Sequence, residues 1–409
     1  MRYECIRAKS ILSKPSVYDS WFHVTRSMNA YRGCEFGCVY CDGMSEGYHV
    51  DNFLTHIRIK ENAHEIVRRE LEKDGFICQS SMETETLIPF LDDEDAQKLK
   101  GRHPIKYCIG VSGGVSDAYQ QAEEENRVTR KVLEVLLDFG MPVFVLTKST
   151  LVLRDLDLLQ RINEKAFATI AFTITLHDED VKQVFEPKSP SATERFDALR
   201  RVKEAGLNGG VMAMPLIPGI GDTIENMTAL ARSTKEAGGD FIQWAGMTLK
   251  PGRQKDYFLS VLRRRFPEHY PRIQRIYQND DKYGEPAFKL LPCNVYERGH
   301  GICKDVGVPD RMPRQTPPGG YVVNTRIVEV LHDISFYRRF RDGHSWYSVR
   351  PLMEAAGKVM TQGLNLGGFE SPEEIVELLD ISSKIAVLIA EVIETGSAES
   401  LKSLHERTS

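Results

Sequence analysis

The chain places three cysteines within eight residues, in the stretch Cys34-Glu35-Phe36-Gly37-Cys38-Val39-Tyr40-Cys41. A structural zinc site needs four protein ligands, and a catalytic zinc site needs three plus a water molecule. A cubane iron–sulfur cluster is normally held by four thiolates. Three thiols in one tight loop therefore suggest a four-iron cluster in which one iron is left open. We expect the rest of the chain to be organised around this loop.

An open iron can take a small chelating ligand. The amino and carboxylate groups of S-adenosylmethionine (SAM) offer such a chelate. An electron passed through the cluster into the sulfonium would break a carbon–sulfur bond and give a 5′-deoxyadenosyl radical, with the protein holding and orienting the cofactors. Two alternatives remain open on the residues alone, namely a zinc loop and three cysteines of an ordinary core.

A resemblance to a known family strengthens the first interpretation. CxxxCxxC with an aromatic residue before the last cysteine resembles the signature of radical SAM enzymes. The longer string at residues 30–42, Ala-Tyr-Arg-Gly-Cys-Glu-Phe-Gly-Cys-Val-Tyr-Cys-Asp, is similar to the branch that contains spore photoproduct lyase, often labelled "DNA repair photolyase". The resemblance implies a [4Fe–4S] cluster on Cys34, Cys38 and Cys41, SAM as second cofactor, and Tyr40 beside the adenine. It also implies an external electron donor such as ferredoxin or flavodoxin.

The composition is that of a globular protein of one large domain or two. The 409 residues are 41% hydrophobic and 27% charged, and the net charge is -5. A large non-specific nucleic-acid footprint needs an excess of Lys and Arg. The net charge therefore argues against such a footprint, although a local basic groove stays possible.

Eight cysteines in a chain of this length do not indicate a disulfide scaffold. The clustered cysteines are typical of metal ligands in a reducing compartment, so we expect a cytoplasmic protein. Residues 1–20 contain no long apolar core, which speaks against a signal peptide. No apolar stretch approaches the length that a bilayer requires, and no membrane association is expected. Cys5, Cys78 and Cys108 are expected in the core.

Strands and helices are expected to alternate along the first 250 residues. Short β-branched runs end in turns, and amphipathic segments follow them. A Ser-Ala-Thr-Glu capping box at residues 191–194 opens one of the helices. The strands are expected at residues 21–29, 105–111, 142–146, 166–176, 210–217 and 241–249. The intervening helices are expected at residues 61–71, 126–139, 151–162, 191–206 and 225–237.

This alternation predicts an α/β fold with a parallel sheet and helices outside it. A doubly wound open sheet would give the same pattern. The partial (β/α)6 TIM-like barrel that we expect rests mainly on the resemblance. Its expected extent is residues 21–250, with an irregular lead-in at residues 1–20 and an acidic exposed insertion at residues 79–104.

A mainly helical C-terminal region is expected at residues 251–409. Its helical patterns cover residues 257–266, 270–277, 325–342, 348–361 and 372–394. We expect this region to cover the mouth of the barrel and to set the specificity for the substrate.

Several candidate site residues follow the ends of expected strands, where the loops of α/β barrels form active sites. Gly113 and Gly114 follow the second strand, and their bare backbone would let a ligand approach closely. The resemblance implies that they contact the SAM amino group and that Ser116 lies near the methionine end. It also implies that Lys148, in a Thr-Lys-Ser triplet, pairs with the SAM carboxylate. The alternatives are a simple turn for the glycines and a solvated side chain for Lys148.

Arg195 belongs to another pattern of the same branch, together with Glu186. Arg195 could reach the ribose or the carboxylate of SAM. The helix dipole does not stabilise a cation at a helix N-terminus. This argues that Arg195 has a role other than stabilising its own helix. A surface arginine is the alternative.

A second group of polar residues occurs beyond the expected barrel. Spore photoproduct lyases carry a hydrogen-donating cysteine before the Ser-Asp pair, where this chain has Gly114-Val115. That departure argues against spore photoproduct repair itself. Cys293 and Cys303 are alternative hydrogen donors, or metal ligands together with His300, although three ligands are too few for a complete site.

Two basic runs occur, at Arg263-Arg264-Arg265 and at Arg338-Arg339. The second has aromatic neighbours, which would suit single-stranded nucleic acid. Faces of amphipathic helices are the favoured interpretation of both runs.

The sequence therefore predicts a radical SAM enzyme that takes hydrogen from an unidentified substrate. The resemblance favours a nucleobase lesion, and the acidic net charge does not support nucleic acid. The alternative is an iron–sulfur protein that carries electrons or senses redox state without cleaving SAM.

Overall fold

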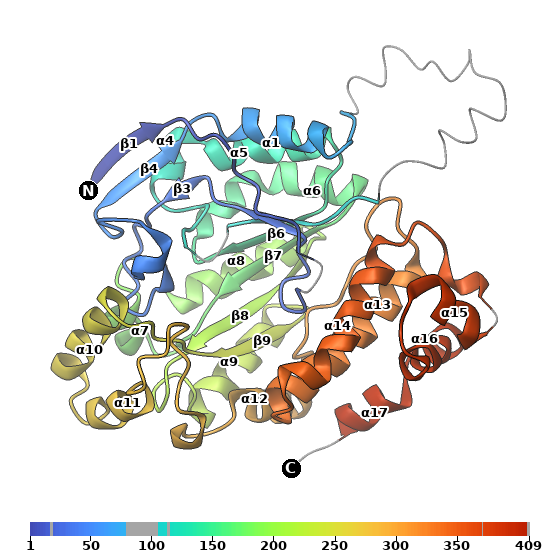
Figure 1. The fold of residues 1–409 in the computed structure, drawn as a ribbon. Coiled ribbons are helices and arrows are strands. Elements are labelled where there is room, and N and C mark those ends of the chain that lie inside the picture. The colour runs from blue at the N-terminus through green and yellow to red at the C-terminus, as the bar shows by residue number, and fades with distance from the viewer. Residues whose placement is uncertain (17–18, 79–104, 113–114, 370, 407–409) are drawn as a thin grey trace.

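The computed structural model describes residues 1–16, 19–78, 105–112, 115–369 and 371–406. The expected acidic insertion and the pair Gly113-Gly114 lie outside these residues. A six-stranded parallel sheet in the order β2-β5-β6-β7-β8-β9 runs through the centre of the molecule (Figure 1). Its strands are β2 (Arg26–Met28), β5 (Ile109–Val111), β6 (Val143–Thr147), β7 (Ala168–Thr173), β8 (Asn208–Leu216) and β9 (Ile242–Gly246).

The order of the strands in the sheet follows their order in the chain. A doubly wound sheet reverses its strand order at a switch point, so the barrel-type arrangement is the one adopted, and the α/β expectation is confirmed. The connecting helices are α1 (Ala63–Lys73), α4 (Ala122–Asn126), α5 (Val128–Asp138), α6 (Leu156–Lys165), α7 (Glu179–Phe185), α8 (Ala192–Glu204) and α9 (Ile224–Glu236). The capping box at Ser191 and Glu194 is present as predicted.

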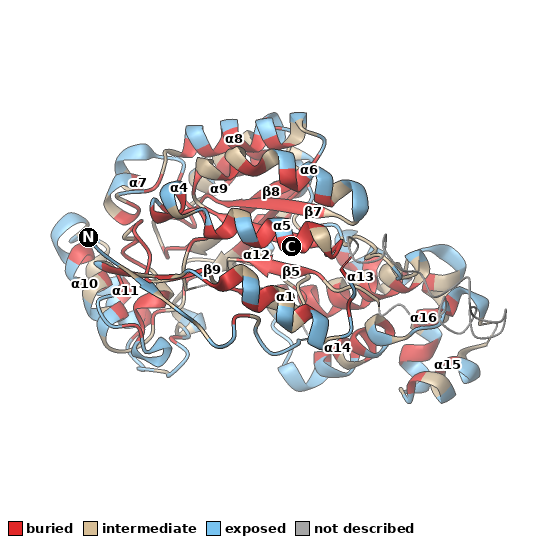
Figure 2. Ribbon diagram, turned by 90° about the horizontal axis from the view of Figure 1, so that it is seen from above, coloured by how far each residue is buried: buried red, intermediate tan, exposed pale blue. Residues whose placement is uncertain are grey.

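Alternate residues of each strand face two different surroundings. Val143 and Val145 of β6 join the large core that includes Leu133 of α5 and Leu159 of α6. Phe144 between them joins a smaller cluster on the other face of the sheet. A parallel sheet covered on both faces needs apolar residues on both, which explains why β6 and β7 are nearly continuous apolar runs. Figure 2 shows the strands buried and the outer sides of the surrounding helices exposed.

A second sheet of three strands lies beside the first, formed by β1 (Arg2–Ile6), β4 (His56–Lys60) and β3 (Tyr31–Arg32). β1 runs parallel to β4, and β3 runs antiparallel to it. The expectation of an irregular lead-in is therefore wrong for residues 2–6. β1 is mostly exposed, so its sequence lacks the apolar run that marks a buried strand.

The C-terminal region divides between opposite sides of the molecule (Figure 1). α10 (Arg253–Arg265) and α11 (Tyr270–Ile276) pack on the cysteine loop, in a cluster that contains Cys34, Tyr40 and Phe258. α12 (Val295–Val306) packs on α9 and β9.

The remaining helices build a separate core. These helices are α13 (Val322–Phe336), α14 (Trp346–Thr361), α15 (Pro372–Leu379), α16 (Ser383–Thr395) and α17 (Glu399–Glu406). The segment that leads to them passes the amino-terminal ends of the strands, where Gln315 bonds Thr169 and Asn208. The expectation that the whole C-terminal region covers the barrel mouth therefore holds only for its first part. None of the described helices is both long and apolar enough to cross a bilayer.

Candidate active site at the cysteine loop

The cysteine loop begins directly after β3 and is held at both ends by backbone hydrogen bonds. The amide of Cys34 donates to the carbonyl of Phe53 (3.2 Å), and the amide of Val39 donates to the carbonyl of Phe185 (2.8 Å). Gly33 before the loop has φ +87°, and a Cβ there would lie 2.8 Å from the carbonyl oxygen of His56. Only glycine meets both demands. The strand end and the turn therefore force the three cysteines into one compact loop.

The three thiols lie in a buried, mutually interacting group. Cys34 and Cys38 are buried, and Cys41 is half-buried. Burial raises the pKa of Cys38 to about 12 and raises the pKa of Cys34 well above its usual value. Burial also raises the pKa of Cys41, and the charges of Cys38 and Cys41 add to the shift at Cys34. Cysteines bind a metal centre as thiolates. Binding of such a centre here must therefore displace the protons of all three thiols.

The segment after β5 fixes the entry into the loop. Ser116 Oγ and Gln120 Nε2 both donate to the carbonyl of Gly33 (3.0 and 3.2 Å). Gln120 Oε1 accepts from the amide of Glu35 (2.9 Å), and the Glu35 carboxylate accepts from the amide of Ala122 (2.6 Å). The Ser116 hydroxyl is thus engaged by the loop itself. Its predicted contact with SAM stays a prediction.

Asp117 joins the ends of two neighbouring strands. Its carboxylate accepts hydrogen bonds from Thr147 Oγ1 (2.6 Å), the amide of Lys148 (2.8 Å) and the amide of Tyr119 (2.9 Å). Burial raises the pKa of Asp117, and these three donors oppose that shift. The Ser-Asp pair and the Thr-Lys-Ser triplet are therefore one structural unit, which fixes the backbone of Lys148.

The Lys148 side chain lies against the cysteine loop. Its Nζ atom sits 5.6 Å from the centre of the Tyr40 ring, and it forms no ion pair with any carboxylate of the described residues. Burial lowers the pKa of Lys148, while Cys38 and Glu186 raise it, and the net shift is upward. The side chain is half-buried, so a fully solvated lysine is not what the structure shows. An ammonium in this setting is suited to receive an anionic group of a ligand.

Behind the loop, Glu186 has four side-chain partners. Its carboxylate accepts hydrogen bonds from the Tyr40 hydroxyl, from Thr175 Oγ1 (2.9 Å) and from Ser189 Oγ (3.1 Å). Arg195 forms an ion pair with it at 2.8 Å, and both side chains are fully buried. Burial alone would raise the pKa of Glu186, but Arg195 and Lys148 outweigh it and lower that pKa to about 2.

Arg195 is therefore not a surface arginine. Its Nη1 atom also donates to the carbonyl of Thr173 (2.6 Å). Its contacts among the described residues go to the protein, so it orients Tyr40 through Glu186. Its predicted contact with SAM stays a prediction.

The donor set fits the cofactors that the sequence predicts. Three thiols from one loop are the ligands that iron–sulfur clusters prefer, and the unpaired ammonium of Lys148 beside them suits a carboxylate. Among the described residues, no three His, Cys, Asp or Glu side chains are grouped closely enough to hold a single metal ion.

The second polar group predicted from the sequence does not form one site. Cys293 lies beside Asp222, with its Sγ atom 3.7 Å from Oδ2. Cys303 is buried and accepts a hydrogen bond from Trp244 Nε1 (3.3 Å). His300 faces Asp310 at 3.0 Å. Cys293, just before α12, and His300 and Cys303 within it thus lie in three different surroundings although they are close in sequence.

The remaining cysteines also differ from one another. Cys78 and Cys108 are buried as expected, whereas Cys5 is exposed on β1, so that expectation is wrong. Alternate residues of an edge strand face solvent, and this explains the position of Cys5.

The half-buried Cys293 lines a cavity of about 620 Å³ at the carboxyl ends of β8 and β9. Its walls come from the strand ends at Leu216 and Gly246, from residues 285–296, and from the π-helical turn Tyr337–Arg341. Cavities of this size are typical of small-molecule sites. This cavity could not be predicted from the sequence, because its walls meet only in the folded chain.

The structure agrees with the favoured interpretation of the two basic runs, namely that they belong to faces of amphipathic helices. Arg263, Arg264 and Arg265 are exposed in the last turn of α10. Of the aromatic neighbours of Arg338 and Arg339, Phe336 and Tyr337 belong to the core of the C-terminal helices, whereas Phe340 is half-buried and lines the cavity at the carboxyl ends of β8 and β9. The rings of Phe336 and Tyr337 are not free to stack on nucleic-acid bases.

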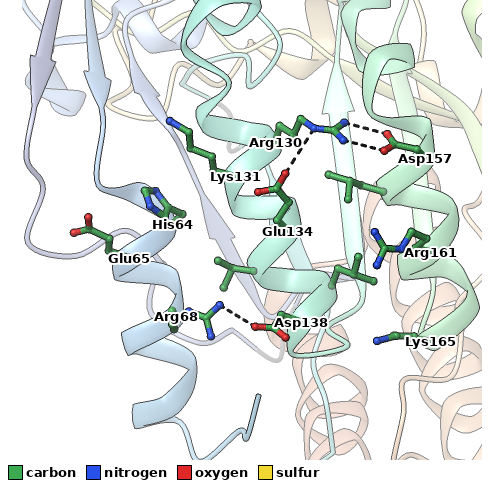
Figure 3. A pocket seen from close by; sticks show the side chains of 13 residues that line it. His64, Glu65, Arg68, Arg130, Lys131, Glu134, Asp138, Asp157, Arg161 and Lys165 are labelled. Carbon is green, nitrogen blue, oxygen red and sulfur yellow. Dashed lines mark hydrogen bonds and ion pairs between the residues drawn. The ribbon is translucent and has the colours of Figure 1, made fainter. Parts of the chain in front are cut away.

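A groove of about 900 Å³ lies between α1, α5 and α6, away from the cysteine loop (Figure 3). Its charged side chains pair with one another. Arg130 contacts Asp157 at 2.9 Å, and Arg68 contacts Asp138 at 2.8 Å. The groove is a solvated seam between helices on the outer side of the sheet.

Comparisons with known proteins give relatives and similar structures. An uncharacterised protein of Mycobacterium tuberculosis is 25% identical over 292 residues, which cover 70% of this chain and 76% of that protein. An uncharacterised protein of Methanocaldococcus jannaschii is 28% identical over 245 residues, covering 59% and 77%.

Among solved structures, a spore photoproduct lyase with a tyrosine-to-phenylalanine substitution has 16% identity and a TM-score of 0.48, covering 74% of this chain and 78% of that one. A cysteine-to-serine variant has 18% identity and a TM-score of 0.42, covering 65% of this chain and 66% of that one.

The family model described as the radical SAM superfamily matches residues 28–231. The match begins in β2, contains all three cysteines of the loop, and ends in α9. The chain belongs to the radical SAM superfamily.

Proposed function

We propose that this chain is a SAM-dependent radical enzyme in which Cys34, Cys38 and Cys41 hold a [4Fe–4S] cluster. The observation that carries the proposal is the gathering of three thiols, two buried and one half-buried, in one loop beside Lys148, whose ammonium forms no ion pair with a carboxylate of the described residues. The bound cluster and SAM supply a 5′-deoxyadenosyl radical on reduction. The chain itself supplies binding, orientation and exclusion of water.

The residues around the loop divide into two roles. Lys148 receives the SAM carboxylate, because no carboxylate of the described residues lies within ion-pair distance of its ammonium and its backbone is fixed by Asp117. Tyr40 offers its ring to the adenine, because Glu186 fixes its hydroxyl. Arg195 supports Tyr40 through Glu186, and Ser116 supports the start of the cysteine loop through the carbonyl of Gly33. Gly113 and Gly114 complete the proposed SAM site.

We place the substrate in the cavity at the carboxyl ends of β8 and β9. Active sites of α/β barrels form at this end of the strands. The wall at Phe288, which is 66% exposed, and the ring of Tyr296 offer apolar contact to a substrate of unidentified structure. A nucleobase is the class that the family resemblance favours.

Cys293 is the better placed of the two candidate hydrogen donors. It lines this cavity, whereas Cys303 is enclosed beneath Trp244. A thiol can give a hydrogen atom to a product radical and leave a thiyl radical behind. Burial raises the pKa of Cys293 to about 12, so the side chain stays a thiol and keeps that hydrogen.

The experiment is anaerobic reconstitution with iron and sulfide, followed by SAM and dithionite. We expect release of 5′-deoxyadenosine, and loss of that release in Cys38→Ala. The control is Cys5→Ala, which changes an exposed cysteine of β1 and should retain it. Absence of 5′-deoxyadenosine from fully loaded wild-type protein would favour the alternative, an electron-transfer or redox-sensing protein.

A further inference from the structure

A cavity of about 490 Å³ lies at the end of the sheet opposite the cysteine loop. One wall is formed by residues that precede the strands, among them His23, Cys108 and Phe167. The facing wall comes from Val328 of α13 and Val359 of α14. The cavity therefore separates the sheet from the C-terminal helices. Nothing in the proposed radical chemistry uses it, since that chemistry takes place at the carboxyl ends of the strands.

The polar centre of the cavity is the half-buried guanidinium of Arg314. Its Nη2 atom donates to His332 Nδ1 at 2.8 Å and to the carbonyl oxygen of Asp19 at 3.5 Å, and the contact of its Nη1 atom is Met360 Sδ at 3.9 Å. Its Nε atom is buried and has no hydrogen-bond partner among the described residues. Within the described residues Arg314 forms no ion pair with a carboxylate, whereas neighbouring Arg311 pairs with Asp333 at 3.0 Å.

The carboxylates nearest to Arg314 are committed elsewhere. Asp333 is paired with Arg311, and Glu329 is paired with Arg326. Asp19 accepts hydrogen bonds from the amides of residues 21, 22 and 24. A partly buried charge without an ion pair lowers the stability of the fold, because it loses hydration and gains no counterion in exchange. Burial lowers the pKa of Arg314 to about 10, which leaves it charged at neutral pH.

A second uncommitted group lies in the same cavity. The Nδ1 atom of His23 is buried and finds no hydrogen-bond partner in the part of the chain that the structure describes. Burial and the charges of Arg314 and Arg311 lower its pKa well below the usual value, so the ring is neutral and can donate one hydrogen bond. The rest of the lining is largely apolar, including Phe167, Val328 and Val359.

We propose that this cavity binds a small organic anion, with a carboxylate or phosphate group on Arg314 and His23 and an apolar or aromatic body against the remaining walls. An anion there supplies the missing counterion and accepts hydrogen bonds from the uncommitted donors of Arg314 and His23. Hydrogen bonds between charged groups are stronger than those between neutral groups. Because the walls come from both the sheet and the C-terminal helices, the ligand also joins these two parts of the molecule. It would act as an effector or structural ligand, not as the substrate.

The test is binding of charged and neutral probes to the full-length chain, measured by ligand-detected NMR. The probes are benzoate, phenyl phosphate, inorganic phosphate and the neutral isostere benzamide. We expect benzoate or phenyl phosphate to bind at least about tenfold more tightly than benzamide, since a charged hydrogen bond is worth about 1.5–3 kcal/mol. Comparison of the two aromatic anions distinguishes a carboxylate ligand from a phosphate ligand. If benzoate or phenyl phosphate binds more tightly than inorganic phosphate, the aromatic ring contributes to binding through the apolar walls.

Variants test whether the preference for anions arises in this cavity. Arg314→Met should abolish the preference for the anion, Arg314→Lys should keep most of it, and Arg350→Met, at an exposed position of α14, should not change it. Gly363→Leu adds bulk at a cavity residue where a Cβ meets no atom within 4 Å, and it should weaken binding while leaving Arg314 in place.

Equal affinity for anions and benzamide in the wild-type chain would overturn the proposal, and so would an anion preference that survives Arg314→Met. If Arg314→Met does not fold, the wild-type ratio and Gly363→Leu decide. Neither iron nor SAM is needed, so the outcome is independent of the proposed radical function.

Discussion

At the scale of single residues, short polar side chains build this site by binding the backbone of the cysteine loop. The carbonyl of Gly33 receives Ser116 and Gln120, and Asp117 ties the ends of β5 and β6 together. These contacts leave Lys148 as the cation beside the loop whose charge has no described counterion. The same logic predicts which side chains act on a ligand and which act on the protein.

Lys148→Met should weaken binding of SAM to the reconstituted protein by about 10- to 100-fold, the value of a lost charge-assisted hydrogen bond. The fold should be retained, since within the described residues the ammonium forms no ion pair and contacts only the Tyr40 ring at 5.6 Å. Equilibrium dialysis with labelled SAM measures the affinity. Lys188→Gln is the control, because this lysine is exposed near the same loop. Equal affinities in wild type and Lys148→Met would contradict the proposed role.

In Cys293→Ala the product radical should persist or give side products, because it receives no hydrogen atom from a thiol. In Cys303→Ala it should react as in the wild type. The reason is that only Cys293 lines the cavity at the strand ends. The measurement is the ratio of 5′-deoxyadenosine released to final product formed, once a substrate is found. A ratio that rises in Cys293→Ala and stays at the wild-type value in Cys303→Ala supports the assignment. The opposite order would remove Cys293 from the mechanism.

At the scale of elements, the six strands of the large sheet could be predicted, because buried parallel strands are β-branched runs that end in turns. β1 could not be predicted, since an exposed edge strand carries no such run. The predicted helix at residues 372–394 is two helices, because Asp380 adopts a left-handed conformation (φ 47°) between α15 and α16. An aspartate tolerates that conformation, but its letter in the sequence does not announce it.

α10 closes the cysteine loop from outside. Phe258 of α10 is fully buried and stacks on Phe185 with ring centres 6.0 Å apart. Phe258→Ala should destabilise the fold by about 3–5 kcal/mol, the usual cost of a large cavity in a core. It should also speed loss of iron from the reconstituted protein. Thermal unfolding and iron release are the measurements, with Phe288→Ala, at an exposed position, as the control. Unchanged iron release would separate α10 from the site.

The ion pair between Glu186 and Arg195 links the end of α7 to α8. The pKa of Glu186 is lowered to about 2 in the folded chain, against about 4.3 in an unfolded one. A depressed carboxyl pKa stabilises the fold above the unfolded value, and this stability is lost as the pH falls towards the folded value. Glu186→Gln should therefore be less stable than wild type at pH 7, and the difference should shrink between about pH 4 and pH 2. Thermal unfolding across this range measures it, and a constant difference would contradict the ionised pair.

At the scale of the whole molecule, the sheet carries different structures at its two ends. The cysteine loop, α10 and α11 gather at the carboxyl ends of the strands, and α13 to α17 lie on the opposite side (Figure 1). The sequence predicted that the three cysteines lie in one loop and that Lys148 follows the end of a strand, because both motifs are local. It did not predict the partners of Glu35 or the cavity around Arg314, since those contacts join residues far apart in the chain. Proximity of Cys293, His300 and Cys303 in sequence was misleading for the same reason.

The most direct test of the account is electron paramagnetic resonance of the reconstituted, dithionite-reduced protein before and after SAM is added. We predict the signal of a reduced [4Fe–4S] cluster that changes on addition of SAM, and loss of the signal in Cys34→Ala. A cluster signal that SAM leaves unchanged, or zinc in place of iron in the purified protein, would contradict the claim that three thiols hold a cluster with one iron open to SAM.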